Sequence, residues 1–140
     1  MEKVLDLIEQ KNNCLVRFKD MNEQEIHNFN EGNFDNLETF YHSRETILEM
    51  IGRLDNKITQ EQHANEQALS VSNESKSRLK QALELKNSLV QDIIELDLMI
   101  ISIIEQAKSQ IIKDLSQVKA VKKVFGTANK KTGSRIDENF

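Results

Sequence analysis

The sequence predicts an all-α protein: an elongated antiparallel three-helix bundle or coiled coil with a long C-terminal helix. The 140 residues include no proline and only four glycines, so little interrupts the backbone. Charged residues make up 30% and aromatic residues 5%, which is typical of helices with an aliphatic core and not of a β-sandwich or an α/β enzyme. Apolar residues recur at helical spacing. The length favours a single domain, residues 1–126, followed by a flexible tail at 127–140.

The first helix is predicted over residues 2–29. Apolar side chains at spacings of three and four share one of its faces, and Asn12 interrupts that face. A partly solvated position for Asn12 is favoured over a buried one that would set the register. Gly32 is expected to adopt a positive φ in the following turn, and Asn33 is expected to cap the second helix.

The second helix is predicted over residues 34–70. It carries a coiled-coil seam made up of Leu37, Phe40, Arg44, Ile47, Ile51, Leu54 and Ile58. Arg44 is the charged member of this seam. The favoured interpretation is a snorkelling side chain paired with Glu45 or with an acidic residue on another helix, and the alternative is a secondary contact with a client protein. Gly52 makes a close backbone approach plausible.

The third helix is predicted over residues 75–125, with Asn73 or Ser75 as its cap and Gly126 as its stop. Its most apolar segment is Ile93–Ile104. Two antiparallel turns would place this segment where all three helices overlap, so we expect it to be the core. The same folding leaves 59–87 as a polar two-helix extension.

One apolar stripe continues beyond the predicted cover of the first two helices. It is made up of Ile111, Ile112, Leu115, Val118, Val121 and Phe125. Burial of each side chain is worth roughly 1.5–3 kcal/mol, so an uncovered stripe marks an interaction site. We predict that it binds a helical client. A second copy of the chain, the tail, or a shifted first helix are the alternatives.

The sequence offers no catalytic or cofactor-binding motif. His27, His42 and His63 are far apart and lie near no cysteine, which disfavours a metal site. There is no Gly-rich phosphate loop, no paired-cysteine motif and no nucleophile elbow. We therefore expect a protein that is not an enzyme and that holds no cofactor and no metal.

Charge and cysteine usage indicate the compartment and the class of partner. The net charge of −4 gives no reason to expect nucleic acid. Membrane insertion is not expected, because the apolar segment is short and contains Glu95 and Asp97. Cys14 is single and the N-terminus lacks a secretory pattern, so a reducing, cytoplasmic location is predicted.

One segment of the third helix resembles part of an enzyme. Ile94–Glu105 is similar to the first helix of the all-helical chorismate mutases, which surround a dicarboxylate substrate with cationic side chains. The positions that should be cationic hold Val90 and Ala107, and Lys108 and Lys119 are out of place. An enzyme of this kind is the remote alternative.

A second resemblance covers roughly residues 10–137. The segments Glu31–Leu37 (EGNFDNL) and Ser43–Leu48 (SRETIL) resemble the helical hairpin of flagellar type III export chaperones of the FliT/FlgN type. The third helix is similar in style, and the tail segment Gly133–Asp137 resembles the ends of some members. Phe125 stands where a tyrosine often closes the last helix in that family.

The resemblance implies a cytosolic chaperone that binds a late flagellar subunit, of the hook–filament junction or filament-cap type, and delivers it to the export machinery. A homodimeric coiled-coil structural or adaptor protein, closed through the same stripe, is the alternative from another class.

Overall fold

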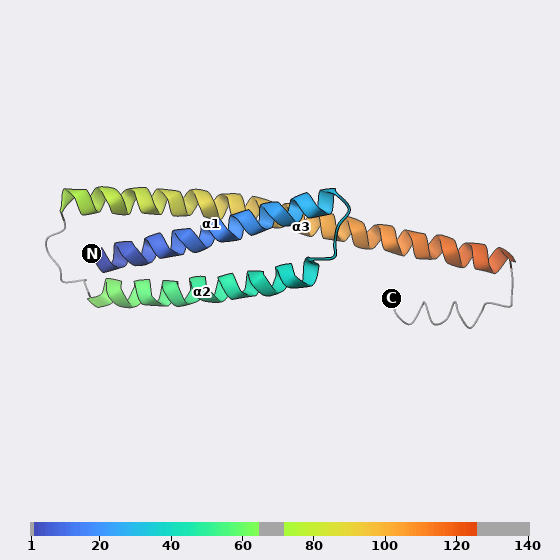
Figure 1. The fold of residues 1–140 in the computed structure, drawn as a ribbon, viewed down its shortest axis with the longest axis horizontal. Coiled ribbons are helices and arrows are strands. Elements are labelled where there is room, and N and C mark those ends of the chain that lie inside the picture. The colour runs from blue at the N-terminus through green and yellow to red at the C-terminus, as the bar shows by residue number, and fades with distance from the viewer. Residues whose placement is uncertain (1, 65–71, 126–140) are drawn as a thin grey trace. The chain divides into compact units, whose positions relative to one another are not determined.

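The computed structural model describes residues 2–64 and 72–125, and it confirms the all-α fold. The helices are α1 (Glu2–Asn30), α2 (Leu37–Ala64) and α3 (Asn73–Phe125) (Figure 1). The chain divides into two compact units after Ile100. The first holds α1, α2 and the first half of α3, and the second holds the rest of α3. The end of the predicted second helix, 65–70, and the predicted tail, 127–140, lie outside the described residues.

A tight turn joins α1 to α2. Gly32 has a φ of +79°, as predicted, and the amide of Asn33 donates to the Asn28 carbonyl at 2.9 Å. The Asn33 side chain accepts from the amide of Asp35 at 3.0 Å, so it closes the turn and does not cap the helix. The prediction that α2 begins at residue 34 is therefore wrong, because α2 begins at Leu37.

The two helices of this hairpin run antiparallel (Figure 1). Lys3 pairs with Glu61 at 3.2 Å, and Lys11 pairs with Asp55 at 2.7 Å. As the residue number rises on α1, it falls on α2. The predicted hairpin around Gly32 is thus confirmed.

Ser72, and neither of the predicted residues, caps α3. Its hydroxyl oxygen accepts from the amide of Ser75 at 3.1 Å, which satisfies one of the free N–H groups at the helix start. The helix then runs parallel to α1. The Arg78 guanidinium reaches Glu2 at 3.4 Å and Glu9 at 3.0 Å, and Lys19 reaches Asp92 at 3.1 Å.

The core of the first unit extends along the whole hairpin. Its three clusters are centred on Val4, Leu5, Ile8 and Ala82; on Leu15, Phe18, Leu89 and Ile93; and on Leu7, Cys14 and Leu54. Ile58 and Leu79 pack against the first cluster. The predicted two-helix extension at 59–87 is therefore wrong, because α1 also covers the start of α3.

The prediction that Ile93–Ile104 forms the three-helix core is also mostly wrong. Ile93 and Ile100 are buried, but Leu98 keeps 62% of its surface exposed, and Ile94, Met99 and Ile101 are exposed as well. The physical reason is the register of α1, since the ion pairs of Arg78 align the start of α1 with the start of α3. The core of α3 accordingly lies earlier than predicted.

Polar side chains are buried along α1. Asn12 is buried, contrary to prediction, and its amide donates to the Ala82 carbonyl at 3.0 Å. Asn22 is fully buried and donates to Asp97 at 2.9 Å. A β-carbon added at Gly52 would meet no atom of the described residues within 4 Å, so the expected close backbone approach there is wrong as well.

Candidate functional site

The predicted client-binding stripe lies in the second unit, on α3. Ile111, Ile112, Val118 and Val121 are exposed to between 44% and 59%, and Leu115 is half-buried. Phe125 ends the helix, but its side chain is outside the described residues. The helix that carries the stripe is long because nothing in its sequence stops it before Gly126. The described stripe is therefore an apolar surface in contact with solvent.

The apolar face of α3 begins earlier than the predicted stripe. Ile103, Ile104 and Ala107 are half-buried and lie on the same side of α3 as Ile111. The sequence pattern had assigned the two isoleucines to the core and given Ala107 no role in binding. The signal that could have identified them is the unbroken spacing of three and four residues from Ile104 through Ala107 to Ile111. From Ile103 to Val121 the face is about 27 Å long, at about 1.5 Å per residue.

Charged residues give this part of α3 a positive balance. Between residues 101 and 125 there are five lysines and two acidic residues, Glu105 and Asp114. At 100° per residue, Lys108, Lys119 and Lys122 fall along one edge of the apolar face or within it. The surface thus combines an apolar centre with a cationic edge, an arrangement that suits an amphipathic helix with acidic flanks.

Arg44, the predicted secondary contact, lies in the first unit. Its guanidinium donates to the Asp97 carboxylate on α3 at 3.0 Å and lies 5.3 Å from the centre of the Phe18 ring. The expected pairing with an acidic residue on another helix is confirmed, and the partner is Asp97, not Glu45. Arg44 and Asp97 together join α2 to α3.

The described helices contain no cluster of metal-ligating side chains and no membrane-spanning segment. Among residues 2–64 and 72–125, no three histidine, cysteine or acidic side chains gather closely enough to hold a metal ion. Within the same residues, no helix is apolar over a sufficient length to cross a bilayer. Asp97, which lies within the segment that is similar to the chorismate mutases, accepts hydrogen bonds from Asn22 and Arg44.

Comparison of the chain with models of known protein families, with curated proteins and with solved structures finds no match.

Proposed function

We propose that this protein is a helical export chaperone that covers an aggregation-prone amphipathic helix of a client protein. The observation that carries the proposal is the exposed apolar face of α3, with Ile111, Ile112, Val118 and Val121 open to solvent. Contiguous exposed apolar residues of this kind mark sites of interaction with another protein. A client helix would lay its own apolar face against this one, which is binding without catalysis.

The identity of the client comes from the resemblance of the hairpin and of α3 to flagellar export chaperones. On that basis the client is a late flagellar subunit, of the hook–filament junction or filament-cap type, bound in the cytoplasm before delivery to the export machinery. A patch of modest size is compatible with later release of the client. Association costs both partners translational and rotational freedom, and a modest patch offsets this cost by only a limited amount.

The alternative is a homodimer that closes through the same face. The spacings of three and four residues from Ile104 to Val118 favour it, because they are those of a coiled-coil seam. Light scattering on the purified chain separates the two functions. A concentration-independent dimer that Leu115→Asp converts to a monomer, and that binds no client, supports the homodimer.

The chaperone is tested by calorimetric titration with the terminal helices of a filament-cap and a hook–filament junction protein. Leu115→Asp combined with Val118→Asp should abolish binding and leave helicity unchanged, since these side chains lie on the exposed face. Leu48→Asp is the matched control, because Leu48 is a similarly exposed apolar residue on α2. Undiminished binding by the Leu115→Asp/Val118→Asp variant would exclude this face as the client site.

A further inference from the structure

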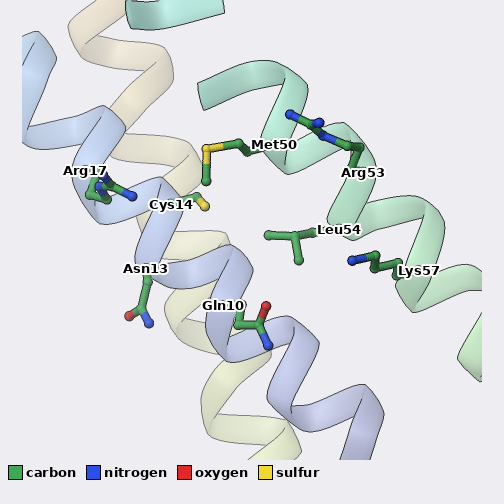
Figure 2. Close-up of a pocket in the computed structure, with 8 residues that line it drawn as sticks. All are labelled: Gln10, Asn13, Cys14, Arg17, Met50, Arg53, Leu54 and Lys57. Carbon is green, nitrogen blue, oxygen red and sulfur yellow. The ribbon is translucent and has the colours of Figure 1, made fainter. Parts of the chain in front are cut away.

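A groove of about 650 Å³ lies between α1 and α2 in the first unit. Its lining residues are Gln10, Asn13, Cys14 and Arg17 from α1, and Met50, Arg53, Leu54 and Lys57 from α2 (Figure 2). Both sets follow the helical pattern i, i+3, i+4, i+7, so each helix presents one continuous stripe to the groove. Two such stripes, side by side on neighbouring helices, form a groove in which an additional helix can pack.

The floor of the groove is apolar. Cys14 and Leu54 are buried and point toward each other from the two helices, and Met50 reaches into the space between them (Figure 2). Leu7 belongs to the same cluster and Ile51 packs against it, so the floor is continuous with the core. An apolar strip of this kind matches the seam of an amphipathic helix.

The rim of the groove is cationic. Arg17, Arg53 and Lys57 are all exposed, and none of the lining residues is acidic. Within the described part of the chain, no ion pair involves any of these three cations. Even Glu49, which lies one helical turn before Arg53, is not paired with it. Arg53 and Lys57 are also like charges at i, i+4, which is unfavourable in an isolated helix.

Several other cations of the same unit are paired across helices, whereas Lys76, Lys80 and Lys86 on α3 have no ion pair among the described residues. Lys11, Lys19 and Arg78 each contact a carboxylate on a neighbouring helix. The chain as a whole carries a net charge of −4, so carboxylates are in excess. Arg17, Arg53 and Lys57 differ in that all three line one groove and have no ion pair among the described residues, so they form a local positive charge that is complementary to an acidic partner.

We propose that the groove between α1 and α2 is a docking site for an acidic amphipathic helix of another protein, which would lie along the hairpin as an added helix of the bundle. The apolar seam of that helix would cover Cys14, Met50 and Leu54. Its flanking glutamates or aspartates would pair with the three rim cations. This site shares no residue with the apolar face of α3 and does not rest on the proposed chaperone function.

The charge pattern disfavours the chain's own C-terminal segments as occupants. Residues 101–125 carry five lysines and two acidic residues, so the end of α3 from a second copy would bring like charge to the rim. Residues 126–140 carry Lys130, Lys131 and Arg135 against Asp137 and Glu138, which is also a positive balance. An acidic helix of another protein has the charge that is complementary to the rim.

The test uses two synthetic helices with the same leucine seam, one flanked by glutamates and one by lysines. Fluorescence anisotropy measures the affinity of each helix for the full chain. In every arm the chain also carries Leu115→Asp and Val118→Asp, so that the apolar face on α3 does not contribute to binding. Arg17→Glu combined with Arg53→Glu reverses the charge of two rim residues. Lys76→Glu combined with Lys80→Glu is the matched control, because both lysines are exposed on α3 and the net charge changes equally.

We expect the acidic helix to bind about tenfold or more tightly than the basic one, as complementary charge at an interface predicts. The variant with the reversed rim charge should bind the acidic helix about tenfold more weakly. The control pair should change this affinity by less than about twofold, because charges outside an interface contribute little. Absence of binding by the acidic helix, equal binding of both helices, or an equal loss in the control would overturn the proposal. So would a wild-type dimer that the rim reversal dissociates, since a second copy would then occupy the groove.

Discussion

The Arg44 guanidinium on α2 donates a hydrogen bond of 3.0 Å to the Asp97 carboxylate on α3. The other oxygen of that carboxylate accepts from the Asn22 amide on α1 at 2.9 Å. Asp97 therefore joins all three helices at a level where only part of the surrounding apolar surface is buried. Hydrogen bonds to a charged group at such a position fix the register of the helices, because a shift of one residue would break both.

Removal of either partner of this pair should destabilise the bundle. We expect Arg44→Ala and Asp97→Ala each to lower the free energy of unfolding by about 1–3 kcal/mol, because the remaining polar groups lose their partners in a half-buried position. The double variant should lose less free energy of unfolding than the sum of the losses in the two single variants. Urea denaturation of the four proteins measures this. Glu45→Ala is the control, and an equal loss from Glu45→Ala would argue against the specific pairing.

Asn12 should respond differently to two substitutions. Its amide donates to the Ala82 carbonyl, but its own side-chain oxygen is buried and has no hydrogen-bond partner among the described residues. Asn12→Leu removes that unsatisfied oxygen at similar volume, so the stability should stay within about 1 kcal/mol of the wild type. Asn12→Ala leaves a cavity, and it should cost about 1–3 kcal/mol. A larger loss in Asn12→Leu than in Asn12→Ala, measured by thermal unfolding, would contradict this account.

The two glycines of the hairpin should give opposite results. Gly52 lies within α2 with open space where a β-carbon would stand, so Gly52→Ala should raise the stability by about 0.5–1 kcal/mol. Gly32 has a φ of +79°, and Gly32→Ala should lower the stability by about 1–2 kcal/mol, because the left-handed conformation is strained for alanine. Chemical denaturation of both variants compares them, and stabilisation by both would be inconsistent with the turn geometry.

The ion pair between Lys19 and Asp92 predicts a pH effect. The hydrogen bond and charge of Asp92 raise the pKa of Lys19 above its ordinary value of 10.5. Because the pKa is higher in the folded state, this contribution to stability is fully present below the unfolded pKa and is lost as the pH rises through the folded pKa. Asp92→Asn should lower the pKa of Lys19, as followed by NMR titration of its ε-carbon. An unchanged pKa in that variant would show that Asp92 is not its cause.

Local features of the fold were accessible from the sequence. The lack of proline, the helical spacing of apolar residues and the turn at Gly32 define three helices and a hairpin, because each depends on residues close in the chain. The starts of α2 and α3 were missed by a few residues. Asn33 and Ser72 use their side chains for a turn and a cap respectively, and short polar runs offer several candidates for each role.

The register of α1 against α3 was not accessible from the sequence. Apolar density and the assumed positions of two antiparallel turns predicted that the segment around Leu98 and Met99 lies in the core, although both side chains are exposed. The actual alignment depends on polar contacts between distant residues, such as Asn12 with Ala82, which apolar periodicity does not reveal. The candidate face on α3 was found in part, from Ile111 onward. The groove between α1 and α2 was missed, because it requires knowing which residues of both helices lie together.

The parallel pairing of α1 with α3 has a consequence for the order of folding. The hydrogen bonds between these helices join residues 69 to 76 positions apart, whereas α1 and α2 are joined by the short turn at Gly32. Closing a long loop costs more chain entropy than closing a short one. During synthesis the hairpin is complete before α3 exists. Until α3 packs against it, the side of α1 that carries Leu15 and Phe18 lacks the α3 residues that bury it. We therefore expect docking of α3 to be the late step, and the interval before it to be when the chain is most prone to aggregate.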